Sequence, residues 1–323
     1  MREIYVAEAI REALTVAMAE DPTVVVLGED VEISTMGTTK GLVEQFGSNR
    51  VRNTPISEAG VLGACVGASA SGLRPVFDIM FSSFFYVCLD AIANQASRMR
   101  FMSGGQMEVP LTVIAPTGPS GSAAAHHSEN PHALLMGLSG IKIAFPSCAA
   151  DMKGLLIESI RDPNPTVVFV DLMTVGQKGP VGDGDLSIPF GVADIKRSGT
   201  DVTVVAIGST VTQSLQVASE LEGEGVSVEV IDPRTLVPFD WGTVEESVRR
   251  TGRLVVVDPT RRTCGAASEV VTRIVESCWT DLRARPERVT WPDVPMPYSP
   301  PLEKLVVQSN DDIRTAILNT LQN

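Results

Sequence analysis

Short apolar runs alternate with longer helical patterns along most of the chain. The runs are rich in β-branched residues, which is typical of buried strands. They lie at residues 24–27, 75–80, 111–115, 141–145, 167–170, 202–207, 226–231 and 254–257. Strands that alternate with helices form parallel sheets covered by helices on their faces. The pattern therefore predicts an α/β fold made of two parallel-sheet domains.

Two stretches interrupt this alternation. Residues 176–185 are rich in glycine and polar residues and have no periodicity, so we place the domain boundary there, between residues 1–180 and 181–323. Residues 292–301 contain five prolines, and we expect them to run extended over the surface because proline disrupts helices and central strands. A last amphipathic pattern predicts a helix over about residues 310–321.

Composition narrows the class of protein. The 323 residues are 44% hydrophobic and 20% charged, which suits a globular chain with a sizeable core. A net charge of -13 and the lack of a Lys/Arg-rich run argue against nucleic-acid and anionic-membrane partners. No apolar stretch is long enough to cross a membrane. The five cysteines are scattered, so we expect reduced thiols and a cytoplasmic protein.

All three histidines fall within residues 126–132, after a Gly/Ser-rich run. Histidine titrates near neutral pH, and loops often carry functional groups, so this segment is a candidate active site. Loop histidines without a task are the alternative. A metal site is a less favoured interpretation. The side chains of His126, His127, Glu129 and His132 are of kinds that bind metals. However, adjacent side chains in an extended loop point to opposite sides, and no cysteine is near.

Phosphate-binding motifs are missing from the sequence. Gly182-Asp183-Gly184 looks like the start of a thiamine diphosphate motif, but it lacks a preceding strand and the Asn that completes such a motif, so we interpret it as a turn. Neither of the common glycine-rich phosphate loops occurs elsewhere. The chain therefore has no obvious means of holding a phosphorylated cofactor by itself.

Glu58 is a second candidate. Ser57 is placed to cap a helix over residues 59–72, with Glu58 in its first turn, where the helix dipole favours a carboxylate. The helix is almost uncharged, and we expect it to pack closely on both sides, with Glu58 at the mouth of a dry region. A carboxylate there can share a proton with a bound base. The simpler interpretation is that Glu58 only stabilises the helix.

Several motifs resemble one family. They include Thr-Pro-Ile-Ser-Glu-Ala-Gly at 54–60, Met-Ser-Gly-Gly-Gln at 102–106, Ala-Ala-Ala-His-His-Ser at 123–128, Val-Glu-Val-Ile-Asp-Pro-Arg-Thr-Leu at 228–236 and the proline-rich run from residue 292 to Lys304. In order and over nearly the whole chain, they resemble the β subunit of the E1 component of 2-oxoacid (pyruvate, branched-chain or acetoin) dehydrogenase complexes. These are thiamine diphosphate enzymes of the transketolase-like superfamily.

The resemblance implies a pyrimidine-binding domain followed by a transketolase C-terminal domain. It also implies an α subunit that completes an α2β2 heterotetramer, holds Mg2+ and the cofactor diphosphate, and shares thiamine diphosphate with this chain. The implied reaction is decarboxylation of a 2-oxoacid and transfer of the acyl unit to a lipoyl-bearing E2 or an acyl-carrier protein.

The resemblance also assigns residues. Glu58 matches the carboxylate that binds N1′ of the aminopyrimidine, Phe81 and Phe84 match the apolar wall around that ring, and His127 matches the active-site histidine. We add His126 as a catalytic candidate because it adjoins His127. The resemblance further implies a site for a monovalent cation, K+. The positions that match this site are Leu111, Thr112, Ser159, Asp162 and Asn164.

Some positions depart from the family pattern. His126 stands where glutamine is common, Ser83 where aspartate is common, and a basic residue is lost within 170–174; residues 258–265 also differ. The cofactor half thus matches, whereas the substrate half is altered. One alternative is therefore a split-transketolase-like transfer of a two-carbon ketol unit from a ketose phosphate to a carrier protein, since extra imidazoles at His126 and His132 suit a hydroxylated substrate. A non-catalytic assembly subunit is another.

Overall fold

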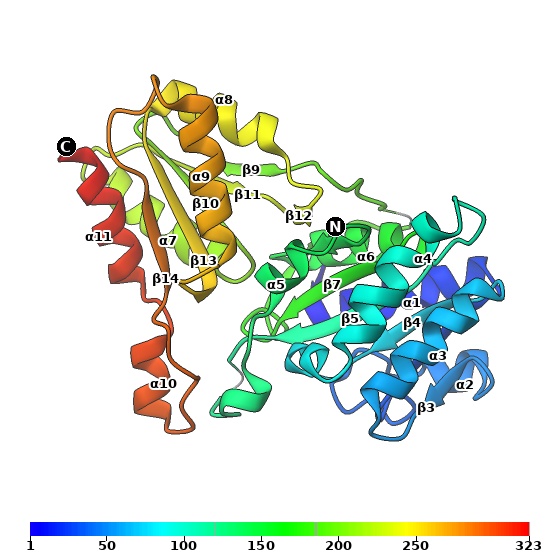
Figure 1. The fold of residues 1–323 in the computed structure, drawn as a ribbon. Helices are drawn as coiled ribbons and strands as arrows, with labels where there is room; N and C mark the ends of the chain where they lie inside the picture. Colours follow the sequence, from blue (N-terminus) through cyan, green and yellow to red (C-terminus); the bar gives the residue numbers. More distant parts are fainter. Residues whose placement is uncertain (120, 185, 323) are drawn as a thin grey trace. The chain divides into compact units, whose positions relative to one another are not determined.

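The computed structural model describes residues 1–119, 121–184 and 186–322. Ser120, before the histidine segment, and Asp185, at the end of the predicted linker, lie outside the described residues, as does Asn323. The chain divides into two compact units. The first comprises Met1–Thr117 and Leu135–Phe190, and the second comprises Gly118–Leu134 and Gly191–Asn323. Each is an α/β unit in Figure 1, as the sequence predicts.

A parallel sheet forms the centre of the first unit. Its strands follow the order β6-β7-β5-β4-β2-β3, and every pairing between these neighbours is parallel. The strands are β2 (Val24–Gly28), β3 (Val51–Asn53), β4 (Arg74–Asp78), β5 (Thr112–Thr117), β6 (Lys142–Ala144) and β7 (Thr166–Asp171). All five apolar runs predicted in this half are strands.

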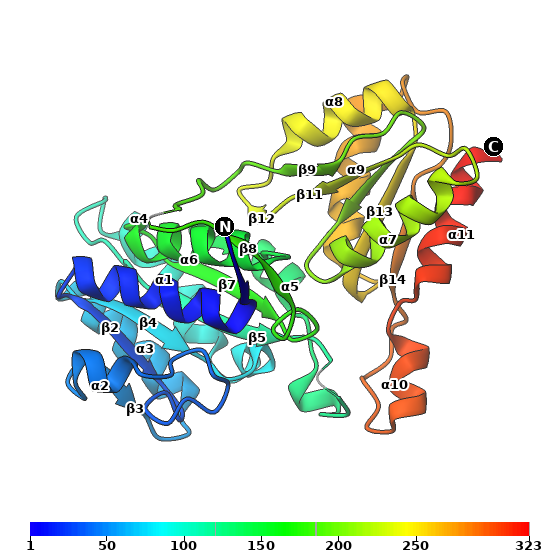
Figure 2. The same ribbon diagram turned by 180° about the vertical axis from the view of Figure 1, so that it is seen from behind.

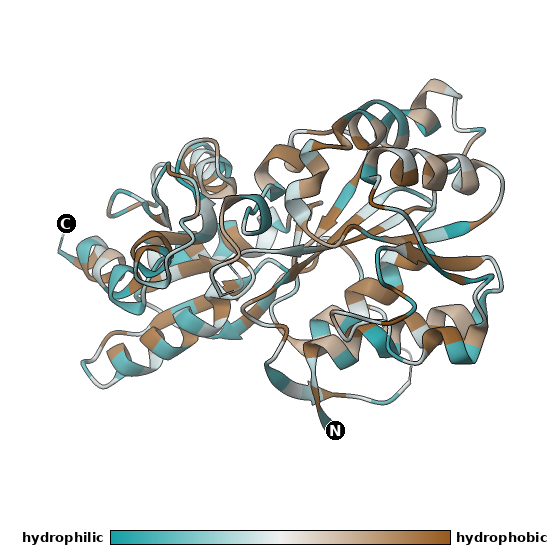
Figure 3. Ribbon diagram, turned by 90° about the horizontal axis from the view of Figure 1, so that it is seen from below, coloured by the Kyte–Doolittle hydropathy of each residue, from teal (hydrophilic) through white to brown (hydrophobic). Residues whose placement is uncertain are grey.

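Helices cover this sheet. Helices α1 and α6 lie side by side on it (Figure 2), and their apolar residues join one core with the strands. The helical segments are α1 (Val6–Glu20), α2 (Leu42–Phe46), α3 (Glu58–Ala70), the 3-10 helix η1 (Ser82–Tyr86), the π-helix η2 (Ala91–Ala96), α4 (Ser97–Met102) and α6 (Ala149–Arg161). Helix α5 (His132–Met136) begins in the second unit and ends in the first. Figure 3 shows apolar residues along the strands and polar residues on the outer sides of helices.

The predicted linker contains a strand. Strand β8 (Lys178–Val181) pairs antiparallel with β1 (Arg2–Tyr5), which ties it to the first unit. The chain then returns over α6, where the N–H of Ile188 donates to the carbonyl of Gly154 at 3.3 Å. A side chain at Gly154 would lie 2.4 Å from the carbonyl oxygen of Leu186, so glycine permits this close approach. Because of these contacts, the first unit extends to Phe190, beyond the predicted boundary at residue 180.

The second unit has its own sheet, with the strand order β14-β13-β10-β11-β9. The pairings of β14, β13, β10 and β11 are parallel, and the edge strand β9 is antiparallel to β11. The elements are β9 (Asp194–Arg197), β10 (Val202–Ala206), β11 (Val228–Asp232), β12 (Thr235–Val237), β13 (Leu254–Arg261), β14 (Glu287–Trp291), the 3-10 turn η3 (Ala125–His127), α7 (Thr210–Glu222), α8 (Trp241–Thr251), α9 (Ala266–Cys278), α10 (Pro300–Val306) and α11 (Asn310–Leu321).

The predicted C-terminal helix is confirmed as α11, with its bounds at Asn310 and Leu321. The expectation for residues 292–301 is wrong at its end, because Pro300 and Pro301 open helix α10. Proline is tolerated in the first turn, where its missing N–H has no helical partner to lose. Among the helices of the described residues, none combines the length and apolarity needed to cross a bilayer.

Candidate active site

Glu58 lies in the first unit, at the start of α3. Ser57 occupies the N-cap position as predicted, but its side chain makes no capping hydrogen bond. Glu58 is the first helical residue and is 9% exposed. Helix α3 is not covered on both sides as expected: Ala59, Gly60 and Ala64 on its other face are exposed in this chain. The helix thus places a buried carboxylate at its positive end and leaves a small-residue face open.

Two further acids follow the neighbouring parallel strands β2 and β4. Gly28 pairs with Asp78, so Glu29 and Asp78 lie at the same sheet edge. Burial raises the pKa of Asp78 to about 6, with the charge of Glu29 adding to the effect and the N–H of Met80, 3.0 Å away, opposing it. Burial, followed by the charges of Glu58 and Asp30, raises the pKa of Glu29. The edge therefore disfavours further negative charge and suits a neutral or protonated group.

We did not predict Glu29 or Asp78 as part of a site. Their signal in the sequence was available, because each lies at or directly after the end of a buried apolar run. The carboxyl ends of adjacent parallel strands share one edge, which is where ligands bind in open α/β sheets. Only the strand order, which places β2 beside β4, shows that these two acids are neighbours.

Phe81 and Phe84 lie at the start of the 3-10 helix η1, in the same unit as Glu58. Their rings meet edge to face with centroids 5.9 Å apart, and both are partly exposed. The neighbouring Phe85, whose ring packs against that of Phe169, is fully buried. Cys88 links this segment to Glu58: its thiol donates to the carbonyl of Phe84 at 3.3 Å, and burial and the charge of Glu58 raise its pKa to about 12. The two rings form a partly exposed apolar surface, and Cys88 connects their segment with Glu58.

The backbone and side chains around these rings are constrained. Met80, which precedes them, has a φ of +66°, an unfavourable value for a residue other than glycine. Ser83 stands where the family resemblance leads to aspartate. Its hydroxyl is buried and has no hydrogen-bond partner among the described residues. A buried hydroxyl of this kind is available to a bound molecule or water.

The histidine segment belongs to the second unit. His126 is exposed and His127 is half-buried, both in the 3-10 turn η3. His132 is fully buried, and its Nε2 lies 2.9 Å from Oδ1 of Asp258 within β13. The three histidines therefore occupy different surroundings. In the described part of the chain, no group of three or more His, Cys, Asp or Glu side chains is arranged to hold a metal ion.

The residues assigned to a monovalent cation lie together between β5, β7 and the end of α6. Thr166 connects them: its N–H donates to Leu111 and its hydroxyl contacts Thr112 and the carbonyl of Ser159. Asp162 receives the ammonium group of Lys142 and the N–H of Asn164, the latter at 2.8 Å. These oxygens already have partners within the protein, and a cation site here stays a prediction.

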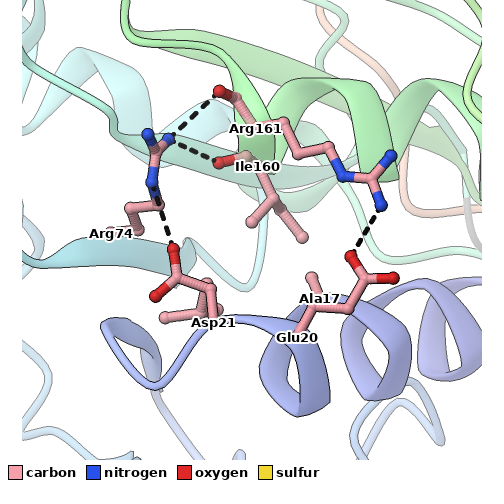
Figure 4. A pocket seen from close by; sticks show the side chains of 7 residues that line it. Ala17, Glu20, Asp21, Arg74, Ile160 and Arg161 are labelled. Atoms are coloured by element: carbon pink, nitrogen blue, oxygen red, sulfur yellow. Dashed lines mark hydrogen bonds and ion pairs between the residues drawn. The ribbon is translucent and has the colours of Figure 1, made fainter.

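The Gly-Asp-Gly segment and a pocket around Arg74 are not part of the candidate active site. The expectation that no strand precedes the Gly-Asp-Gly segment is wrong, because β8 ends at Val181, directly before it. Asp183 is exposed and pairs with Arg2 at 2.8 Å, and no helix follows in the described residues up to Phe190, so the segment still has the character of a surface loop. A pocket in Figure 4 lies at the opposite sheet edge, where β2 and β4 begin. Arg74 there contacts Asp21 and the carbonyl of Ile160, so the charged groups that line this pocket are paired within the protein.

Comparison with known proteins agrees with this architecture. The model of the transketolase pyrimidine binding domain matches residues 2–175, and that of the transketolase C-terminal domain matches residues 191–313. The acetoin:2,6-dichlorophenolindophenol oxidoreductase subunit beta of Bacillus subtilis (strain 168) is 38% identical over 99% of this chain and 98% of its own length. The pyruvate dehydrogenase E1 component subunit beta of Rhizobium meliloti (strain 1021) is 38% identical over 98% of this chain and 70% of its own.

A solved structure shares the fold. The structure described as a split gene transketolase, inactive beta4 tetramer, has a TM-score of 0.79 and 23% identity, and the match covers 99% of this chain and 98% of that one. At this identity the likeness concerns the fold alone.

Proposed function

The chain belongs to the family of two-domain, transketolase-like E1 β subunits, and from that premise we propose that it acts with an α subunit as a thiamine-diphosphate-dependent enzyme. The assembly would be an α2β2 heterotetramer. It would decarboxylate a 2-oxoacid and pass the acyl unit to a lipoyl-type carrier. The observation that carries this proposal is Glu58, a buried carboxylate at a helix N-terminus in the domain that matches the pyrimidine-binding model.

The residues of the first unit fit the aminopyrimidine ring of the cofactor. Glu58 would hold a proton between its carboxylate and the ring nitrogen, and Phe81 and Phe84 would provide apolar surface for the ring. When bound, thiamine diphosphate supplies the nucleophilic carbon and the electron sink of the reaction. Burial is the main cause that raises the pKa of both Glu29 and Asp78 at this sheet edge, so a further full negative charge there is disfavoured and a shared proton is favoured.

The diphosphate and Mg2+ would be held by the α subunit, because the sequence contains no phosphate loop and carries a net charge of -13. In the second unit, His127 would donate a proton to, or hydrogen-bond, the oxygen of the reacting group. Its half-buried position on the turn lets its ring reach a ligand. His126, exposed beside it, would be a second proton donor.

A direct test uses the heterotetramer reconstituted with an α subunit from the same organism that carries a Gly-Asp-Gly…Asn motif. We expect carbon dioxide release from pyruvate or a branched 2-oxoacid, with an artificial dye or a lipoyl carrier as acceptor. Glu58→Gln should lower turnover by about a hundredfold, a usual loss when general acid–base catalysis is removed. His127→Ala should mainly slow transfer to the carrier. Unchanged rates in both variants would favour a non-catalytic assembly subunit.

Ketol transfer is the second candidate. The exposed position of His126 next to His127 favours it, since two imidazoles on one turn give a hydroxylated substrate more hydrogen-bond partners. Assays of the same tetramer with xylulose 5-phosphate decide between the two. Ketol transfer without carbon dioxide release from any oxoacid would establish this alternative, and carbon dioxide release from an oxoacid alone would exclude it.

A further inference from the structure

The histidine loop, defined as residues 118–134, is held by the second unit although the chain on both sides of it belongs to the first. Its downstream end contacts the last residues of β13. His132 and Asp258 form the innermost contact, with 2.9 Å between Nε2 and Oδ1 and no exposure of either side chain. The second oxygen of Asp258 accepts the N–H of Ala267 at 2.8 Å, in the first turn of α9. The carboxylate is thus fixed by a helix on one side and holds the loop on the other.

Three consecutive residues after Asp258 add to this attachment. The guanidinium group of Arg261 makes a bidentate pair with Glu129, at 2.7 and 2.5 Å. The hydroxyl of Thr260 donates to the carbonyl of Asn130 at 2.9 Å, and the Asn130 amide donates to the carbonyl of Pro259. The loop is therefore attached to β13 at residues 129, 130 and 132, immediately after the two candidate histidines.

The upstream end has an attachment of its own. The N–H of Ser122 donates to the carboxylate of Glu303 in α10 at 3.0 Å. His126 and His127 thus lie between two attachments that are 7 residues apart in the chain, from Ser122 to Glu129.

The backbone between the attachments is strained. Ser122 has a φ of +72°, and Ala124 has φ +62° and ψ -173°, a region that only glycine adopts without cost. The N–H of His127 donates to the carbonyl of Ala124, which closes the turn directly after this residue. A strained conformation of this kind persists only when the surrounding structure holds it, and such strain is concentrated at functional sites.

We propose that His132 and Asp258 are positioning residues, whose buried pair holds the strained turn and so presents His127 to the reacting group in one conformation. His132 thereby has a role that needs no contact with substrate. The proposal rests on the proposed function for the part played by His127, but the attachment of the loop can be tested without turnover.

Two substitutions at one position separate the hydrogen bond from the imidazole ring. His132→Gln keeps an N–H donor near the position of Nε2, whereas His132→Ala removes it. In the reconstituted heterotetramer, we expect His132→Ala to lower kcat for acyl transfer by about tenfold or more, since a small displacement of a reacting group costs that much. The donor KM should stay within about twofold because the loss concerns the transition state. His132→Gln should recover most of the rate.

Amide hydrogen exchange provides the second measurement and needs no substrate. His132→Ala should speed exchange of the amides of residues 121–128 by about tenfold or more, and His132→Gln should not. Ser247→Ala is the matched control, because it removes a buried hydrogen bond to the carboxylate of Glu229 in the same unit, away from the loop. It should leave loop exchange and the transfer rate unchanged.

If His132→Ala does not fold, Glu129→Gln weakens the more accessible Arg261 pair and should produce the same pattern in smaller degree. Wild-type exchange in the loop of a folded His132→Ala or Glu129→Gln variant would overturn the attachment. Equal loss in the Gln and Ala variants at residue 132 would overturn the role of the hydrogen bond. A wild-type tetramer without activity on any donor would refute the proposed function, while the exchange results would still decide the attachment.

Discussion

The carboxyl group of Asp78 links stability to pH at the scale of a single residue. Burial raises its pKa from the ordinary 3.8 to about 6. An acid whose pKa is raised on folding stabilises the folded state fully below pH 3.8, and this contribution is lost as pH rises through about 6. We therefore expect Asp78→Asn, which keeps an oxygen for the N–H of Met80, to gain stability relative to wild type between pH 4 and 7. The gain should be at most roughly 3 kcal/mol.

Urea unfolding of the two proteins across this pH range measures the effect. Other carboxyl groups titrate in the same window, but they are common to both proteins and cancel in the difference. If the difference in unfolding free energy between wild type and Asp78→Asn does not vary from pH 4 to 7, the pKa of the Asp78 carboxyl is not raised by folding.

Single residues also show how far sequence reasoning reaches. The histidine cluster and Glu58 were found because rare residue types stood in a short, distinctive pattern. Their surroundings could not be predicted, because the buried partner of His132 is Asp258, which is 126 residues away in the sequence. Likewise, the strained φ of Ala124 has no signal in the residue type. Long-range pairing and tertiary strain decide these features, and a local pattern contains neither.

At the scale of elements, apolar runs identified the largely buried strands of both sheets but not the short or half-exposed ones. The eight runs belong to strands that helices cover on the sheet faces, so their residues are apolar at nearly consecutive positions. This continuity makes such strands recognisable in the sequence. Strands β1, β3, β8, β9, β12 and β14 were missed. Most of them are short or half-exposed, as in β8 with a single buried residue, so their polar side chains resemble those of a loop.

Helix caps allow a test at the same scale. Ser309 and Ser299 both occupy N-cap positions, of α11 and α10, but only Ser309 accepts a hydrogen bond, from the N–H of Asp312, in a capping box. We expect Ser309→Ala to lower the unfolding free energy by about 1 kcal/mol and Ser299→Ala to leave it nearly unchanged. Chemical denaturation of both variants measures this. Equal losses would show that the residue type, and not the hydrogen bond, determines the stability of these ends.

At the scale of the whole molecule, cofactor binding depends on what the chain lacks as much as on what it contains. The first unit offers Glu58 and an aromatic surface for a ring. Acids outnumber Lys and Arg by 39 to 26, and the sequence has no phosphate loop. A diphosphate would therefore meet an unfavourable field with no specific donors to offset it. We therefore expect the binding energy for that half of the cofactor to come from the proposed α subunit and its Mg2+.

Calorimetry of the isolated chain tests this division. Titration with thiamine diphosphate and Mg2+ should show no measurable binding, whereas the heterotetramer should bind with a dissociation constant in the micromolar range, about 8 kcal/mol. Adding Glu58→Gln to the tetramer should weaken binding much less than omitting the α subunit, because the diphosphate provides most of the specific contacts. Micromolar binding by the isolated chain would contradict the division, and it would place a phosphate site among residues of this chain that no sequence motif indicates.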